Sequence, residues 1–193
     1  MIVGDPSVFA LESGITYAYE RLSFIALGFF LIHIGGRRCG VNEPDATMLA
    51  NSFGEVEDRI ARRGRHVAPF ALELDAGKIA DAFCSGVYAD EHHDSYFGIS
   101  WSEFRDLFYS NHLMWAPDGD AAFDDGSFVL HFDVGDRVRL IGFKFSADYR
   151  YVPDTLSDQW LGADEFYEVL RQWHAAFEAE WRARPKTSES AQV

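Results

Sequence analysis

The stretch "SFVLHFDVGDRVRLIGFKF" (Ser127–Phe145) decides the fold. Its first half alternates apolar side chains on one face, at Phe128, Leu130, Phe132 and Val134. Gly135-Asp136 then forms a two-residue turn, because glycine adopts the positive φ that such turns need. The partner strand is Val138–Phe145, and this register places Phe128, Leu130 and Phe132 beside Phe143, Ile141 and Arg139. The sequence therefore predicts a β-hairpin with a strongly apolar face.

A second hairpin is predicted around Gly35-Gly36, between strands Phe24–Ile34 and Arg37–Val41. Phe24–Ile34 is apolar on both faces, which is typical of a central strand covered on both sides. Phe30 and Ile32 are therefore expected in the core. Two further strands are predicted on either side of a turn at Ser13-Gly14, namely Ser7–Glu12 and Ile15–Glu20.

The first predicted helix lies within "NEPDATMLANSFGEVEDRIARRG". Its apolar residues share one face: Ala46, Leu49, Phe53, Val56 and Ile60. Asn42 or Asp45 is expected to cap its start, and Gly64 to end it. Four arginines near its end could be a nucleic-acid patch, but we interpret them as cations that complement the helix macrodipole. One of them, Arg59, also pairs with Glu55 one turn earlier.

Three more helices complete the predicted architecture. The second covers Asp75–Ala89, and the third begins at Ser100, where "SWSE" is a capping box. The fourth is the C-terminal "ADEFYEVLRQWHAAFEAEWRAR", with a long apolar stripe. The expected fold class is α+β, with a mainly antiparallel sheet built from hairpins and packed with flanking helices. Residues 1–184 are expected to form a single domain, and residues 185–193 a flexible tail.

The composition favours a well-packed intracellular protein. Of the 193 residues, 48% are hydrophobic and 16% aromatic, which suffices for one core. Cys39 and Cys84 cannot form a disulfide framework or a zinc cluster, so each is predicted to be a small buried side chain. The apolar run Leu22–Ile34 is shorter than the about 20 residues of a membrane helix. The N-terminus lacks the features of a signal peptide. A cytoplasmic location without a membrane partner is expected.

The charge balance is strongly acidic, with 17 Lys and Arg against 31 Asp and Glu and a net charge of −14. Such a surface repels nucleic acid. From Tyr88 to Asp125, nine acids face one base, Arg105, which gives −8. The nine are Asp90, Glu91, Asp94, Glu103, Asp106, Asp118, Asp120, Asp124 and Asp125. Either this segment only adds solubility, or it forms a surface that selects a basic partner.

Four of these acids, Asp118, Asp120, Asp124 and Asp125, lie immediately before the hairpin. The spacing fails as an EF-hand calcium loop, because the fifth, sixth and twelfth positions carry the wrong residues; a looser oxygen-ligand site stays open. "PDGD" and "DDGS" favour turns and a strand entry. The cluster is predicted to shape the turn and also to form an acidic surface for a partner. Trp115 beside it is either an aromatic anchor of that surface or a core residue.

No pattern for catalysis or cofactor binding is found. His92 and His93 are adjacent, so they lack the i,i+4 spacing of a helical metal pair, and a solvated loop is the simpler interpretation. Nucleophile-elbow, phosphate-loop and dinucleotide motifs are absent. The sequence therefore predicts no cofactor, no metal and no enzymatic activity.

Four segments together resemble the immunity protein 42 family: "MIVGDPSVFALE", "EPDATMLANSF", "WAPDGDAAFDDGSFVLHFD…RVRLIGFK" and "FYEVLRQWHAAFEAEW". The resemblance spans Met1 to about Trp181. It implies a bacterial protein that neutralises a secreted toxin of a polymorphic or contact-dependent system, and it implies no catalytic residues.

The function predicted is a stoichiometric inhibitor that binds a cognate, basic toxin domain through Asp118, Asp120, Asp124, Asp125 and Trp115. An acidic patch gives such an inhibitor a fast association rate and partner selectivity. Two alternatives stay open. One is a small metal-dependent or hydrolytic enzyme that uses the Asp118–Asp125 loop with His92 or His93, and the other is a generic interaction domain.

Overall fold

The computed structural model describes the chain except for residues 22–24, 73, 118, 147, 149 and 188–193. The strands of the described residues form antiparallel sheets. The first sheet has the order β1 (Ile2–Asp5), β2 (Phe9–Ala18), β3 (Ala26–Ile34) and β4 (Arg37–Cys39), and β5 (Thr47–Met48) also pairs with β3. The second has the order β11 (Ser157–Gly162), β10 (Arg137–Lys144), β9 (Ser127–Val134) and β8 (Met114–Ala116). A small third sheet joins β6 (Ser95–Tyr96) and β7 (Ile99–Ser100).

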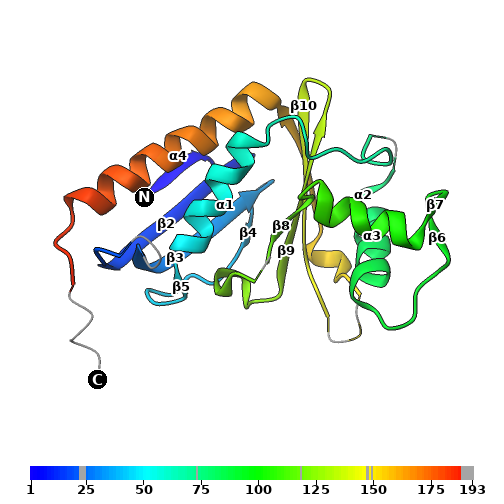
Figure 1. Cartoon of the computed structure of the whole chain (residues 1–193), viewed down its shortest axis with the longest axis horizontal. Helices are drawn as coiled ribbons and strands as arrows, with labels where there is room; N and C mark the ends of the chain where they lie inside the picture. The colour runs from blue at the N-terminus through cyan, green and yellow to red at the C-terminus, as the bar shows by residue number, and fades with distance from the viewer. Residues whose placement is uncertain (22–24, 73, 118, 147, 149, 188–193) are drawn as a thin grey trace.

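The α-helices are α1 (Ala50–Ala61), α2 (Ala76–Phe83), α3 (Trp101–Ser110) and α4 (Ala163–Ala183). Short helical turns occur at η1 (Cys84–Tyr88), η2 (Ala121–Phe123) and η3 (Pro153–Thr155). Figure 1 shows α1 and α4 with the first sheet on one side of the second sheet, and α2 and α3 on its other side. The α+β class and the long C-terminal helix are confirmed.

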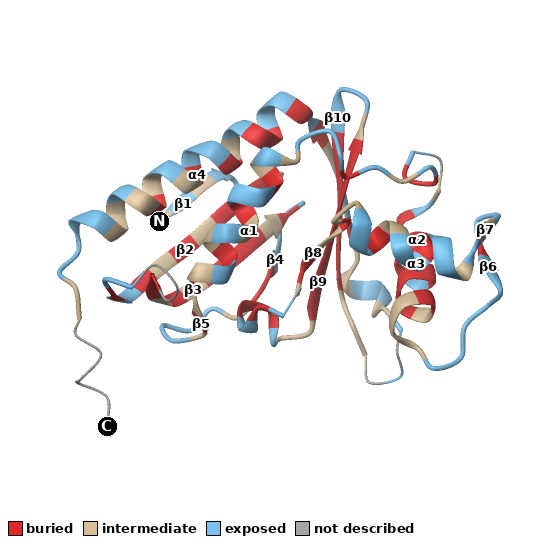
Figure 2. Ribbon diagram, in the orientation of Figure 1, coloured by how far each residue is buried: buried red, intermediate tan, exposed pale blue. Residues whose placement is uncertain are grey.

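The second sheet separates two hydrophobic cores, because both faces of its central strands are buried (Figure 2). Phe128, Leu130 and Phe132 of β9 pack in the core shared with α2 and α3, whereas Val129 packs in the core shared with α1 and α4. The predicted register is confirmed, with Phe128, Leu130 and Phe132 opposite Phe143, Ile141 and Arg139. Gly135 has the positive φ that the turn requires, +62°.

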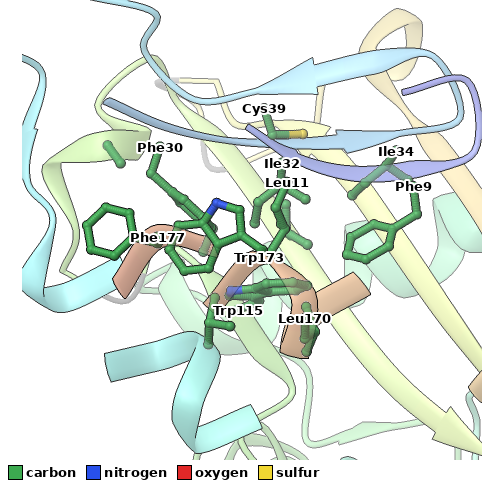
Figure 3. Close-up of a cluster of buried hydrophobic side chains, with 14 of the residues drawn as sticks. Phe9, Leu11, Phe30, Ile32, Ile34, Cys39, Trp115, Leu170, Trp173 and Phe177 are labelled. Atoms are coloured by element: carbon green, nitrogen blue, oxygen red, sulfur yellow. The ribbon is translucent and has the colours of Figure 1, made fainter. Parts of the chain in front are cut away.

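The strand β3 is central, as predicted, but only one of its faces is fully covered. Phe30, Ile32 and Ile34 belong to the core under α1 and α4 (Figure 3). On the opposite face Leu31 is buried, but Leu27, Phe29 and His33 are only half-buried, so the predicted coverage on both sides is only partial. The Gly35-Gly36 hairpin is confirmed, and Phe24 lies outside the described residues.

The predicted turn at Ser13-Gly14 is wrong, since β2 runs through it without interruption. Ser13 and Gly14 pair with Phe30 and Phe29 of β3. A Cβ atom on Gly14 would lie 2.4 Å from the ring of Phe29. Glycine is therefore needed here for the close approach of a side chain, and the reversal of the chain occurs earlier, between β1 and β2.

The first helix begins later than predicted. Neither Asn42 nor Asp45 caps α1, which starts after Leu49 without a side-chain cap. The preceding residues Thr47–Met48 form β5 instead, because pairing with β3 satisfies their backbone groups. Gly64 follows the helix with a positive φ of +81°, in agreement with its predicted role as the stop.

The remaining helix predictions hold. The Asp75 side chain caps α2 by accepting from the backbone N–H groups of Gly77 and Lys78, and a π-helical turn, η1, extends the helix to Tyr88. The capping box between Ser100 and Glu103 is present. Cys39 and Cys84 are both buried and unpaired, and burial raises the pKa of each thiol to about 12.

After α4, where the sequence predicts a tail, Lys186 forms a bridge with Ala18 of β2, and the backbone N–H of Thr187 donates to the Ala18 carbonyl. The rest of the predicted tail, residues 188–193, lies outside the described residues. Among the helices of the described chain, none combines the length and apolar character needed to cross a membrane.

Candidate protein-binding surface

The loop between β8 and β9 contains the residues predicted to meet a partner, and the structure gives them different roles. Trp115 of β8 is 2% exposed. Its ring lies 5.9 Å from that of Phe166 and 6.1 Å from that of Phe9, inside the core seen in Figure 3. Two roles were left open for Trp115, and the structure shows the second: Trp115 is a core residue.

Asp120 is buried and ties the loop to distant parts of the chain. Its carboxylate accepts hydrogen bonds from the hydroxyls of Thr47 (2.7 Å) and Ser52 (2.5 Å) and from the backbone N–H of Ala122 (2.9 Å). With 8% exposure it offers little surface to a partner. Together with Ser52 and Trp115 it lines a pocket of about 230 Å³ between α1 and the loop.

The other loop carboxylates lie nearer the solvent. Asp125 accepts from the backbone N–H and hydroxyl of Ser127 and pairs with the Lys144 ammonium at 3.0 Å. Asp124 is exposed at the end of η2, and Asp118 lies outside the described residues. The turn-shaping role that the sequence predicts therefore rests on Asp120 and Asp125, and Asp124 is the fully exposed acid among the described residues of this loop.

A larger acidic surface lies on the helical lobe, which we define as α2, η1, β6, β7 and α3 (residues 76–110). Six acids face two bases in this segment, Lys78 and Arg105. All six acids are exposed: Asp81, Asp90, Glu91, Asp94, Glu103 and Asp106. Asp81, Asp90 and Glu91 line a shallow depression of about 640 Å³ that also contains Arg150 and Asp148.

Exposed apolar side chains gather in and beside the same lobe. Phe97 and Tyr109 are 38% and 49% exposed, and Val67 and Leu72, on the segment leading into the lobe, are 45% and 63% exposed. Exposed aromatic and aliphatic groups among charges are characteristic of surfaces that bind other proteins. The helical lobe thus combines an acidic surface with apolar contact groups.

His92 and His93 lie on the surface of this lobe. The His92 ring stacks on that of Trp101 at 3.7 Å between centroids, and the His93 backbone N–H donates to the Tyr96 hydroxyl. Within the residues that the structure describes, no three His, Cys, Asp or Glu side chains are grouped to hold a metal ion.

The sequence did not reveal a buried polar cluster centred on Arg59 of α1, which is 1% exposed. Its guanidinium donates to the carbonyl oxygens of Met114 (2.8 Å) and His112 (3.1 Å) and pairs with Glu55. It also lies 3.0 Å from Nδ1 of His131. Arginine carries only donors, so Nδ1 is the acceptor of this hydrogen bond. The proton of the neutral His131 ring is therefore on Nε2.

Asp133 completes this cluster from β9. Its carboxylate accepts from the backbone N–H groups of Gly64 and His66 and from the Tyr167 hydroxyl at 2.8 Å, and it faces Nε2 of His131 at 3.6 Å. One sequence feature could have indicated this cluster: His131 and Asp133 are polar residues at alternate positions of β9, on the face opposite to its apolar side chains. The cluster links α1, β9 and α4 beneath the surface.

Burial controls the titration of this cluster. It lowers the pKa of His131 to about 3 and that of His66 to about 4, in both cases with the help of the Arg59 charge. Burial opposes ionisation of Asp133, but the groups that donate to its carboxylate prevail and lower its pKa to about 2. Burial also raises the pKa of Tyr167. At neutral pH the cluster therefore contains two neutral histidines and one carboxylate.

The family described as immunity protein 42 matches residues 1–176 of this chain. A comparison with curated proteins found no match. Among solved structures, the crystal structure of CdiI from Burkholderia dolosa AUO158 is similar, with a TM-score of 0.57 and 14% sequence identity over 91% of this chain and 99% of that chain. At this identity the likeness shows a shared fold alone.

The family match includes every element up to most of α4, and with them the acidic loop and the helical lobe. It agrees with the resemblance carried by the four quoted sequence segments. The chain therefore belongs to the immunity protein 42 family, and its function is that of an immunity protein, which neutralises a cognate toxin.

Proposed function

We propose that this immunity protein neutralises its toxin by direct, stoichiometric binding, and that the toxin presents a basic surface to the helical lobe. The observation that carries the proposal is the gathering of six exposed acids and several exposed apolar side chains on and beside residues 76–110. Like charges this close repel one another, and a basic partner relieves the repulsion. The proposed mechanism is binding without catalysis in the cytoplasm, and it requires no metal, cofactor, nucleic acid or membrane.

The Asp118–Asp125 loop keeps a smaller part in this proposal. Asp124 is exposed and Asp125 is partly so, and both can add to the negative potential that a basic toxin meets. Asp120 and Trp115 support the loop from inside, because both are buried. Their contribution to binding is indirect, through the shape of the turn.

Association kinetics test the basic partner. The cognate toxin domain, in a catalytically inactive form, is to be measured at low and high salt against the unchanged full chain and three variants of it. The lobe variant Asp90→Asn/Glu91→Gln/Asp94→Asn is expected to associate roughly tenfold more slowly at low salt and to show a flatter salt dependence, because electrostatic steering speeds encounter. Asp124→Asn is expected to show a smaller effect of the same kind.

The control variant is Glu43→Gln/Glu57→Gln/Glu165→Gln, which removes the same charge from exposed positions outside the lobe. Its association rate should stay close to that of the unchanged protein. Equal slowing in both triple variants would show that only net charge matters, and unchanged rates in the lobe variant would place the toxin elsewhere.

A further inference from the structure

A groove runs along one face of α3. Its wall on the helix consists of residues at helical spacing, which therefore share a face: Glu103, Asp106, Leu107 and Ser110. The opposite wall is formed by Pro69, Gly98 and Ile99. The groove is wide open to solvent, and its volume is about 550 Å³. In Figure 1 α3 lies on the side of the second sheet opposite to the first sheet and α4.

The groove has an apolar base and acidic edges. Ile99 and Leu107 are half-buried and pack against the core that the second sheet shares with α2 and α3. Glu103 and Asp106 are exposed. One carboxylate oxygen of Glu103 is used in the capping box with Ser100. The structure shows no hydrogen bond or ion pair from the Asp106 carboxylate to another described residue.

Among the described residues, no ion pair joins Arg105, the basic residue of α3, to either of these acids. The Arg105 guanidinium lies over the rings of Trp101 (5.7 Å) and Tyr109 (5.8 Å), and helical spacing puts these three residues on the side of α3 away from the groove. Phe97, which precedes the groove residue Gly98 in the chain, is exposed, and its ring lies 5.1 Å from that of Phe70.

We propose that this groove receives a lysine or arginine side chain from the basic surface of the toxin. The aliphatic stem of such a residue packs along Ile99 and Leu107, and its charged end lies between Glu103 and Asp106. Charge complementarity selects this occupant, since a purely apolar side chain would leave the acidic edges without a partner. The inference rests on the proposed function and specifies where the toxin is held.

The test fills the groove without altering the core. Ser110 is exposed and lines the groove, so Ser110→Tyr should obstruct it. With the inactive cognate toxin domain, Ser110→Tyr is expected to weaken binding at least tenfold in Kd while the melting temperature of the free protein stays unchanged. The matched control is Ala175→Tyr, at an exposed position of α4, which should bind like the unchanged protein.

A second pair of variants tests the charged edges. Asp106→Asn and Glu103→Gln remove one charge each, and glutamine can still complete the capping box. Each is expected to weaken binding several-fold, mainly through faster dissociation.

If Ser110→Tyr and both charge variants bind like the unchanged protein, the groove inference is wrong. The proposed function would still stand in that case, provided that the Asp90/Glu91/Asp94 variant slows association. If the unchanged protein forms no complex with the toxin domain, the proposed function itself fails.

Discussion

Replacing Phe30 with alanine is expected to lower the free energy of unfolding by about 3–5 kcal/mol, the range for deleting a buried aromatic side chain. Phe30 is 1% exposed in the central strand β3. Its ring meets that of Trp173 of α4 edge-on at 5.0 Å, and Phe123 of η2 lies 6.2 Å away (Figure 3). The loss should be large because this one ring of β3 packs against two other elements, α4 and η2.

Chemical denaturation with urea measures this loss, and Tyr17→Ala is the control. Tyr17 is 47% exposed in β2, so its truncation should cost less than about 1 kcal/mol. A loss for Phe30→Ala as small as that of the control would mean that β3 does not anchor the core under α1 and α4.

Lowering the pH from 7.5 to 5.0 is expected to reduce the free energy of unfolding by about 4 kcal/mol, roughly 2 kcal/mol for each of two buried histidines. His131 and His66 have folded pKa values of about 3 and about 4, below the ordinary value of 6.5. Protons therefore bind the unfolded chain first. The stability that these residues contribute is complete above pH 6.5 and is lost as the pH falls toward their folded pKa values.

Substitution separates the two histidines. In His131→Asn the side-chain oxygen can still accept from Arg59, and in His66→Asn the side-chain amide can still donate to the carbonyl oxygens of Asn111 and His112. Each variant is expected to keep about half of the pH dependence. His92→Asn, at an exposed position, is the control. Equal stability of the unchanged protein at pH 7.5 and 5.0 would contradict the burial of neutral imidazoles.

The parts of the fold that the sequence predicted correctly are set by residues close together in the chain. The hairpins at Gly35-Gly36 and Gly135-Asp136 follow from glycine conformation, and the start of α3 follows from the Ser100 capping box. The α4 stripe follows from its spacing, with Phe166, Leu170, Trp173 and Phe177 buried. Such signals act between residues a few positions apart, and here the tertiary packing agrees with them.

The parts that the sequence missed depend on distant contacts. Gly14 was interpreted as part of a turn, but a glycine is needed there because the ring of Phe29 from the next strand leaves no room for a side chain. Asn42 and Asp45 are residue types that often cap helices, but the residues after them pair with β3 and form β5 instead of a helix. In both cases tertiary contacts override local preference.

The candidate site was predictable in composition but not in detail. The clustering of acids between Tyr88 and Asp125 indicated an acidic surface, whereas only the structure separates the buried Asp120 from the exposed Asp124. The separation arises because Thr47 and Ser52, 73 and 68 residues earlier, donate to Asp120. The sequence did reveal the pairing of Arg59 with Glu55, but its burial beside His131 of β9 depends equally on the fold.

Titration of toxin activity with this protein tests the central claim, stoichiometric neutralisation, most directly. The active cognate toxin domain is held at a concentration well above the Kd of the complex, and its activity is measured after each addition. Direct binding predicts a linear fall in toxin activity that ends at a fixed stoichiometric ratio and does not progress with time. Progressive loss of activity at a small fraction of that ratio would show turnover, and would contradict inhibition by binding.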